Sequence, residues 1–424
     1  MEARNPNRWL IAAAGVVMQV ALGAVYAWSV FRDPLIKAFG WSIPEVTAIF
    51  ELAILTLGFA SFVGGLWMRR TGPRTVGITG GVLYGLGVFL ASFSANKLWL
   101  LFLTYGFIGG AGIGLGYIVP IATLVKWFPD KRGMITGIAV AGFGAGALLT
   151  APIATRLIQT VGVLQTFAIL GLAYLILVAG SSSFMRNPPE GYSPPGWQPS
   201  QAQLTQRAAK DFTLREALRT WQWYALWALL FLNVTAGISI ISQAAPMARE
   251  ITGASVAAAA GLVGIISIAN GAGRFLWAWF SDFTGRKWVF LVMFLLQAVI
   301  FFIMPRVQAF GLFAVLAFIV LLCYGGGFGT MPAFATDYFG PRNVGSIYGL
   351  ILTAWGVGGV VGPMVIAFLR ESTGAYTRAL LIIAAVMLAS AILPLIVRAP
   401  RRQEEAQPVR KDDVVPSTTR TTGH

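Results

Sequence analysis

Long apolar stretches recur along nearly the whole chain, separated by short polar segments that carry most of its lysine and arginine. Each stretch approaches or exceeds the ~20 residues that an α-helix needs to cross the hydrocarbon core of a bilayer. The pattern therefore predicts an all-α membrane protein with twelve transmembrane helices. We place them at residues 9–31, 44–67, 75–95, 98–124, 134–158, 162–184, 223–247, 256–280, 288–305, 309–331, 345–368 and 376–397.

A polar, proline-rich segment at residues 185–222 divides the predicted spans into two groups of six. Within it, residues 211–219 have the pattern of a short amphipathic helix on the membrane surface. We therefore assign residues 1–184 and 223–398 to two six-helix bundles. Residues 185–222 form a cytoplasmic central loop in this interpretation, and residues 399–424 form a cytoplasmic tail.

The two predicted bundles repeat each other's motifs at a nearly constant offset. Pro120 and Pro332, late in the fourth and tenth spans, are 212 residues apart, and Gly137 and Gly349 in the next spans are separated by the same number. A shared offset at separate places indicates an internal duplication. Two parallel repeats of six helices, with a binding site between them near the bilayer midplane, are typical of many secondary transporters.

The composition agrees with a membrane protein, because 57% of the residues are hydrophobic and 11% are charged. Soluble domains contain roughly 25% charged residues. The net charge is +15, and its distribution along the chain indicates the topology: 22 of the 31 lysine and arginine residues fall at the termini and in the loops on one side. The positive-inside rule places that side, with both termini, in the cytoplasm. We expect a multi-pass protein of a prokaryotic inner membrane, with the lipid bilayer and not nucleic acid as its partner.

Several classes of chemistry are excluded by the residues that the chain lacks. Its single cysteine, Cys323, cannot form an internal disulfide, and its single histidine, His424, is the last residue. The sequence also contains no phosphate-binding Walker loop and no G-x-S-x-G nucleophile motif. We therefore expect no enzymatic activity, no metal and no cofactor.

Arg274 is the strongest candidate for a functional residue. It lies about two-thirds of the way along the eighth span, where a charge costs roughly 2.5–3.5 kcal/mol on insertion scales. Glu51 on the second span is the one clearly intramembrane carboxylate, and the other acids lie in loops or at span ends. An unpaired guanidinium attracts a planar anion, with which it can form two parallel hydrogen bonds. We predict that Arg274 binds the carboxylate of a substrate; a structural ion pair is the alternative.

Two polar residues could support this site. Asn270 lies one helical turn before Arg274 on the same face, where it could orient the guanidinium or bind the substrate. Glu51 is the candidate for proton coupling, because a carboxyl group within the membrane can bind and release a proton. The alternatives for Glu51 are that it remains solvated near the interface or pairs with Arg32.

Aromatic residues form a second group of candidates for the substrate site. Tyr117 and Tyr324 flank glycines near the repeat-related prolines, at the expected depth of the midplane, and we predict that they line the cavity. The alternative role of membrane aromatics is packing or anchoring at the interface. The other aromatic candidates are Tyr26, Trp28, Phe143 and Phe328.

A loop motif and several other segments resemble a known family. Asp282, Gly285, Arg286 and Lys287 match the D-x-x-G-[RK]-[RK] loop of the major facilitator superfamily, in which charges clamp neighbouring helices. The first-half copy departs from this pattern, because Arg69 stands where that family usually has aspartate. The chain as a whole resembles the oxalate:formate antiporter family and, more distantly, the monocarboxylate transporters. The matching segments are residues 23–28 (GAVYAW), 112–117 (GIGLGY), 126–133 (KWFPDKRG), 186–192 (RNPPEGY), 211–213 (DFT), 270–274 (NGAGR) and 342–345 (RNVG).

The resemblance implies a twelve-helix major facilitator fold and a small carboxylate as the substrate, with two departures. In the oxalate carrier of that family, an arginine of the eighth span and a lysine of the eleventh span hold the dianion. Arg274 matches the arginine, but Ile351 stands at the lysine position. Animal monocarboxylate transporters have an aspartate for proton coupling where this chain has Asn270, which cannot titrate. One fixed cation suits a monocarboxylate better than oxalate, because charge balance dominates in a dry cavity.

These observations predict a secondary active transporter of small monocarboxylates such as lactate, pyruvate or formate. We expect symport with a proton by alternating access, and a monomer. The first alternative is carboxylate exchange of the oxalate–formate type. A second alternative, a non-transporting membrane sensor, is disfavoured by the short polar tail at residues 399–424.

Overall fold

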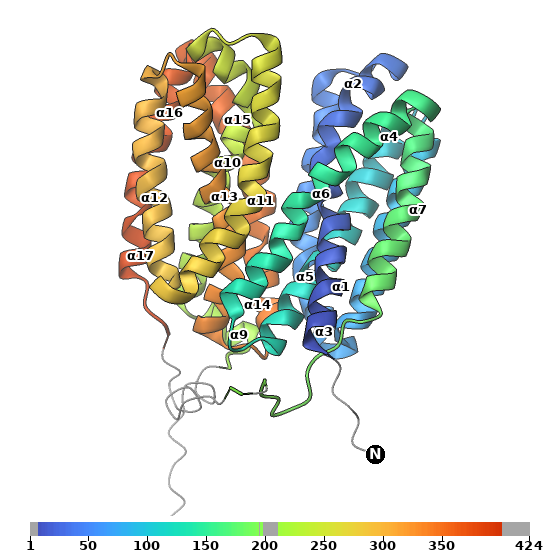
Figure 1. Cartoon of the computed structure of the whole chain (residues 1–424), viewed down its shortest axis with the longest axis vertical. Helices are drawn as coiled ribbons and strands as arrows, with labels where there is room; N and C mark the ends of the chain where they lie inside the picture. The colour runs from blue at the N-terminus through green and yellow to red at the C-terminus, as the bar shows by residue number, and fades with distance from the viewer. Residues whose placement is uncertain (1–6, 195, 198–210, 401–424) are drawn as a thin grey trace, which may run out of the picture.

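The computed structural model describes residues 7–194, 196–197 and 211–400, and within these ranges its regular elements are all helices. They form two bundles side by side, and both ends of the described chain lie at the same end of the molecule (Figure 1). We call this the termini end, and the other the open end. Residues 401–424 of the predicted tail and residues 198–210 of the central loop lie outside the described residues.

Each bundle contains six crossings, and several of them consist of consecutive helical segments. The first bundle comprises α1 (Arg8–Leu22), the 3₁₀ turn η1 (Gly23–Ala27), α2 (Trp28–Phe39), α3 (Ile43–Leu90), η2 (Ala91–Phe93), α4 (Leu98–Leu101), the π-helical η3 (Phe102–Gly109), α5 (Gly110–Trp127), α6 (Arg132–Val161) and α7 (Val163–Ser182). The second comprises α9 (Leu214–Leu218), α10 (Trp221–Thr252), α11 (Val256–Thr284), α12 (Arg286–Ile303), η4 (Met304–Arg306), α13 (Phe310–Phe339), α14 (Val344–Ile351), α15 (Thr353–Thr373), α16 (Tyr376–Ser390) and α17 (Ile392–Ile396).

The long helix α3 is two transmembrane helices. Gly72 has φ 81° and ψ 170°, a backbone conformation that glycine tolerates, and Pro73 follows it at the first position of the second helix. Ten described segments are long and apolar enough to span a membrane, and one of them, residues 43–93, contains this break and crosses twice. With α11, which carries the buried Arg274, there are twelve crossings, as the sequence predicted.

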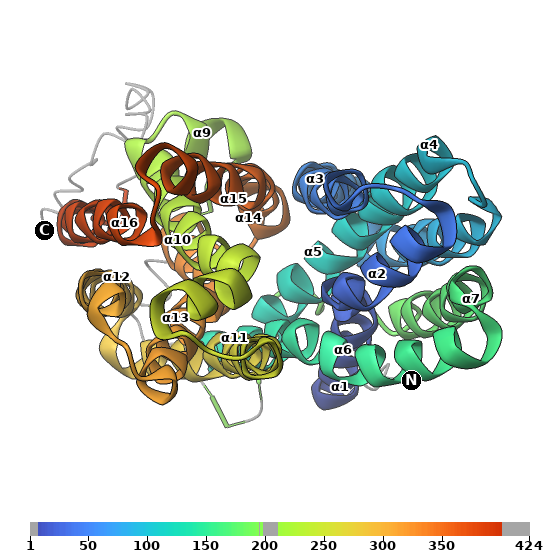
Figure 2. The ribbon, with the colours of Figure 1, turned by 90° about the horizontal axis from the view of Figure 1, so that it is seen from above.

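The bundles meet at two main contacts: α3 lies against α14 and α15, and α6 lies against α11 and α13 (Figure 2). Glycines bring the backbones together at both contacts. A methyl group at Gly65 would overlap the carbonyl oxygen of Gly345, and one at Gly144 would lie 2.6 Å from the Cα atom of Gly271. Since a side chain at either position would separate the helices, these glycines permit the close packing of the two bundles.

Charged groups reinforce the closure at the termini end. The Asp282 carboxylate accepts hydrogen bonds from the backbone N–H groups of Gly133, at 3.0 Å, and Met134, at 2.9 Å, in the first turn of α6. Asp337 pairs with Arg286 of its own bundle, at 3.0 Å, and with Arg132 of the other bundle, at 3.2 Å. These interactions join the two bundles.

The first-half copy of this loop makes no equivalent clamp in the described structure. Arg69, at the position of Asp282, is exposed and has no ion pair with a described residue. The neighbouring Met68 lies where a methyl group on Gly345 would be placed, so packing replaces the charge interaction at this contact. Where the sequence departs from the family motif at Arg69, the bundles are therefore in contact through packing of Met68 against Gly345, and the described Arg69 forms no ion pair.

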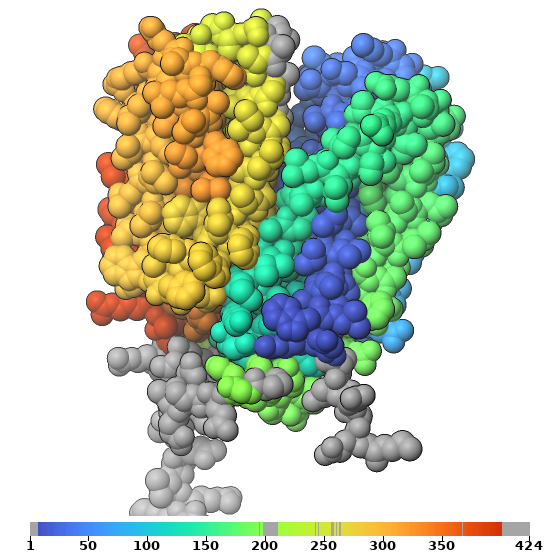
Figure 3. Space-filling view, viewed as in Figure 1, coloured from blue at the N-terminus to red at the C-terminus, as the bar shows by residue number. Residues whose placement is uncertain are grey.

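Towards the open end the bundles diverge. The space-filling view shows a cleft between them at this end, whereas they are in contact at the termini end (Figure 3). The structure therefore has one closed and one open side, which is the geometry of one state of an alternating-access protein.

We predict that Gly65→Ala weakens closure of the termini end, because the added methyl group overlaps the Gly345 carbonyl. Overpacking of this kind costs about 1–3 kcal/mol, which corresponds to about a 5- to 150-fold change in the equilibrium constant between the closed and the opened termini end. The measurement is the rate of maleimide labelling of Ser346→Cys, whose native side chain is fully buried beside this contact. Labelling should accelerate in Gly65→Ala and not in Gly180→Ala, where a methyl group meets open space. Equal rates in all three proteins would refute the role of this contact.

Candidate functional site

Arg274 is fully buried on α11, where that helix faces α6 of the other bundle. Its Nε donates a hydrogen bond to the Asn270 side-chain oxygen at 3.2 Å. Its two terminal nitrogens donate long hydrogen bonds to the backbone oxygen of Val140, at 3.5 Å, and to the hydroxyl of Tyr26, at 3.4 Å. All three partners are neutral, and no carboxylate among the described residues pairs with Arg274. The site therefore contains an uncompensated positive charge.

Aromatic rings surround the guanidinium. Its central carbon lies 4.7 Å from the ring centre of Phe328, 5.3 Å from that of Phe143 and 5.9 Å from that of Tyr26. The negative face of an aromatic ring stabilises a cation, by roughly 2 kcal/mol or more where water is excluded. The rings thus reduce the cost of burying Arg274 without neutralising it, so an anion can still bind.

Trp355 completes this aromatic group and was missed by the sequence analysis. Its ring centre lies 4.8 Å from that of Phe328, 5.5 Å from Tyr117, 5.6 Å from Phe143 and 6.3 Å from Tyr26. It therefore contacts aromatic residues of both bundles. One signal was present in the sequence, because Trp355 lies about one helical turn after Ile351, a position that the sequence analysis had already singled out.

Several buried polar groups near Arg274 lack hydrogen-bond partners of normal geometry. They are the hydroxyl groups of Tyr117, Tyr324 and Tyr348 and the indole N–H of Trp355. These groups face one another: the hydroxyls of Tyr117 and Tyr348 approach each other, and the Tyr324 hydroxyl approaches the Tyr26 hydroxyl and the Trp355 indole N–H. Buried polar groups are normally paired, so this cluster of hydroxyls and an indole N–H without well-formed hydrogen bonds is an exception among the described residues.

Two buried amides hold the backbone of the helices that carry these tyrosines. Gln19 on α1 donates a hydrogen bond to the backbone oxygen of Tyr117 at 3.1 Å. In the second bundle, Asn233 on α10 donates to the backbone oxygen of Tyr324 at 3.1 Å and accepts from Gln297 at 3.2 Å. These contacts fix α5 and α13 relative to the first helix of each bundle, and they therefore position both tyrosines.

The structure brings together seven of the residues that the sequence analysis proposed for the substrate site, contributed by both bundles. These are Tyr26, Tyr117, Phe143, Asn270, Arg274, Tyr324 and Phe328. Trp28 is elsewhere: its indole N–H donates to the backbone oxygen of Val46 at 3.0 Å, and its ring packs 4.4 Å from Tyr105 inside the first bundle. We correct this assignment, because residues two positions apart in a helix point to different faces and Tyr26 faces Arg274.

Glu51 is half-buried on α3 and has no ion pair with a described residue. The alternative partner, Arg32, pairs instead with its neighbour Asp33 at 3.1 Å. The backbone of Leu55, one turn after Glu51, lies against Gly356 of α15. Glu51 is therefore on the face of α3 that points to the second bundle, one turn nearer the open end than this contact.

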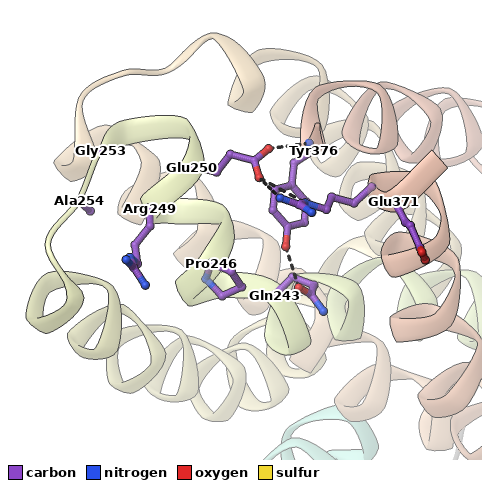
Figure 4. A pocket seen from close by; sticks show the side chains of 9 residues that line it. Gln243, Pro246, Arg249, Glu250, Gly253, Ala254, Glu371 and Tyr376 are labelled. Carbon is purple, nitrogen blue, oxygen red and sulfur yellow. Dashed lines mark hydrogen bonds and ion pairs between the residues drawn. The ribbon is translucent and has the colours of Figure 1, made fainter. Parts of the chain in front are cut away.

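A cavity lies away from Arg274, at the open end of the second bundle (Figure 4). It has a volume of about 890 Å³ and is lined by residues of α10, α15 and α16 and of the turn after α10. Glu250 binds Arg370 at 3.1 Å and the backbone N–H of Tyr376 at 3.0 Å, and the Tyr376 hydroxyl donates to Gln243 at 2.7 Å. These contacts tie three helix ends together within one bundle. They compensate the Arg370 charge, in contrast to that of Arg274.

The described residues offer no metal site, since no three histidine, cysteine, aspartate or glutamate side chains gather in a suitable group there. Cys323 is buried. The chemistry of the central site is therefore that of a cation, aromatic rings and unpaired hydrogen-bond donors, which suits recognition of a small organic anion.

We predict that Asn270→Asp lowers the affinity for a carboxylate by about tenfold or more, because the new carboxylate would pair with Arg274 and compete with the ligand. Isothermal titration of the purified protein with L-lactate, pyruvate and formate measures this effect. Asn270→Ala is the matched control: it removes the same acceptor without adding charge and should cause a smaller loss. An Asn270→Asp protein with unchanged affinity would contradict the placement of the anion at Arg274.

Comparisons with known proteins agree with this architecture. The family model of the Major Facilitator Superfamily matches residues 9–267 and 228–422. The oxalate:formate antiporter of Oxalobacter formigenes is 28% identical over 414 residues, which cover 96% of each chain. Monocarboxylate transporter 13 of Rattus norvegicus is 27% identical over 391 residues, covering 90% of this chain and 86% of the relative.

Among solved structures, the transporter FucP in its outward conformation is similar in fold, with a TM-score of 0.66 and 18% identity over 91% of this chain and 97% of FucP. The family match extends over both bundles, and the structural match covers nearly all of both chains. The chain therefore belongs to the major facilitator superfamily, related to the oxalate:formate antiporter and the monocarboxylate transporters.

Proposed function

We propose that this protein is a secondary active transporter that carries a small monocarboxylate, such as lactate, pyruvate or formate, together with a proton. The observation that carries the proposal is the buried Arg274, which pairs with no carboxylate among the described residues. A buried charge without a partner is costly, and a bound substrate anion would supply the missing counter-charge. The names of the two relatives, an oxalate:formate antiporter and a monocarboxylate transporter, favour the same substrate class.

A single negative charge on the substrate fits the site best. Ile351, at the position of the second cation in the related oxalate carrier, is fully buried and apolar. A dianion would therefore retain an uncompensated charge in a site of low dielectric constant, where charge imbalance is most costly. The unpaired donors on Tyr117, Tyr324 and Trp355 can bind the remaining oxygen atoms of the ligand.

Glu51 is the proposed proton carrier. Asn270 cannot titrate, and Glu51 faces the gap between the bundles with no counter-ion among the described residues. A carboxyl group in this position can bind a proton from the open side and neutralise the charge that the substrate brings. Exchange without net proton movement is the second candidate, favoured by Asn270 at the position of the coupling aspartate and by the antiporter relative.

Alternating access would come from rocking of residues 1–184 against residues 223–398 around the central site. By the positive-inside rule, the distribution of lysine and arginine favours a cytoplasmic termini end, so this structure would face outward in the inner membrane. To reverse access, the protein would open the glycine contacts and the Asp282 and Asp337 interactions. Nothing in this mechanism requires more than one copy of the chain, and we propose a monomer.

The test is uptake of labelled L-lactate, pyruvate and formate into proteoliposomes that contain the purified protein, with and without an inward proton gradient. Symport predicts uptake that rises with the gradient and collapses when a protonophore is added. Uptake that ignores the gradient but rises when a carboxylate is preloaded inside would show exchange instead. If none of the three anions enters under either condition, the proposed substrate class is wrong.

The role of Glu51 is tested in the same vesicles with Glu51→Gln, which keeps the shape of the side chain but cannot carry a proton. Gradient-driven uptake should fall to the level without a gradient, while exchange of internal for external substrate should continue. Glu45→Gln is the control, because Glu45 is exposed and caps the start of α3 through Ser42. Gradient-driven uptake that persists in Glu51→Gln would exclude Glu51 as the carrier.

A further inference from the structure

A second, smaller cavity lies at the termini end of the first bundle, and none of its described lining residues belongs to the central site. It has a volume of about 410 Å³ and lies between the break in α3 and the residues that follow α7. Its lining residues include Thr71, Gly72, Arg74, Ser183, Arg186 and Asn187. Gly72 and Arg74 belong to the first-half copy of the D-x-x-G-[RK]-[RK] loop, which makes no charged clamp in the described structure and leaves this cavity without a role in the transport mechanism.

The cavity carries uncompensated positive charge. Arg74 and Arg186 both line it and are exposed, and neither has an ion pair with a described residue. None of its described lining residues is acidic. Lys126 lies at the rim, where its Nζ donates a hydrogen bond to the Asn187 side chain at 3.2 Å, but Asp211 lies within electrostatic range of this cation, so the two arginines carry the uncompensated charge. Two free guanidinium groups that line one cavity suit a phosphate, whose oxygens accept paired hydrogen bonds.

The backbone adds to this preference. The helix restarts after Gly72, with Pro73 at its first position, and the residues of that first turn line the cavity. The start of a helix carries a partial positive charge and favours anions. The partial positive charge of this helix start and the charges of Arg74 and Arg186 would therefore attract the same anion.

The surface beside the cavity is apolar. Phe184 lies two residues before Arg186 and is 44% exposed, and α7 exposes Leu172, Ile176 and Leu177 along the same bundle. A ligand with both a phosphate and hydrocarbon chains would match this combination of surfaces. A soluble phosphate would use only the charged part.

We propose that this cavity binds the phosphate of an anionic phospholipid from the leaflet at the termini end, through Arg74 and Arg186. Basic pockets between transmembrane helices on the cytoplasmic side are suited to such headgroups. The bound lipid would link the break in α3 to the end of α7. It would thus stabilise the first bundle without contacting the central site.

The test is retention of phosphatidylglycerol by the purified full-length protein, measured by native mass spectrometry in competition with phosphatidylcholine. We expect Arg74→Gln combined with Arg186→Gln to weaken phosphatidylglycerol retention by about fivefold for each arginine removed. The control is Lys37→Gln with Arg378→Gln, which removes the same charge from exposed positions at the open end, away from the leaflet that the cavity faces. The control should retain the lipid like the native protein.

A single variant and a competition with inorganic phosphate complete the test. Arg186→Gln alone, at an exposed side chain, replaces the double variant if that protein does not fold, and it should lose about fivefold. Inorganic phosphate should not displace phosphatidylglycerol from the native protein. Equal losses in the control and the double variant, or no loss in either, would overturn the proposal. Displacement by inorganic phosphate would show a site for a soluble anion instead of a lipid.

Discussion

The burial of one guanidinium without a counter-charge is the constraint on which the rest of the structure depends. Arg274 is withdrawn from water completely, yet its described partners are a side-chain amide, a backbone carbonyl, a hydroxyl and ring faces. These groups stabilise the cation but leave its charge in place. A protein interior tolerates such a charge poorly. The arrangement is therefore understandable as a site that is complete only when an anion occupies it.

The two bundles enclose this site, and their contacts close the side toward the termini end. Close glycine contacts on two helix pairs, together with the Asp282 and Asp337 interactions, seal the termini end. The contact of Gly144 with Gly271 lies one turn from Arg274, so closure and the ligand site are adjacent. A ligand that binds aromatic and polar groups of both bundles can therefore influence how the bundles sit against each other.

The sequence predicted the crossings and the central cation because both follow from strong, local energetic rules. Apolar length defines the spans, and the cost of a membrane charge requires Arg274 to face the interior. The rotation of each helix was harder to predict. Trp28 was included although its spacing from Tyr26 puts it on another face, and Trp355 was missed although it shares a helix face with Ile351. Contacts between bundles, such as Gly65 with Gly345, depend on packing that no local pattern encodes.

Isothermal titration of purified Arg274→Gln with L-lactate, pyruvate and formate tests the central claim most directly, with Arg274→Lys as the charge-conserving control. Removing one partner of a buried charge pair weakens binding by at least about 30-fold, so Arg274→Gln should bind an anion that the native protein binds at least about 30-fold more weakly. Arg274→Lys should retain part of the affinity, because it keeps the charge but loses the paired hydrogen bonds. Native affinity in Arg274→Gln, with the protein folded and inserted, would contradict the account.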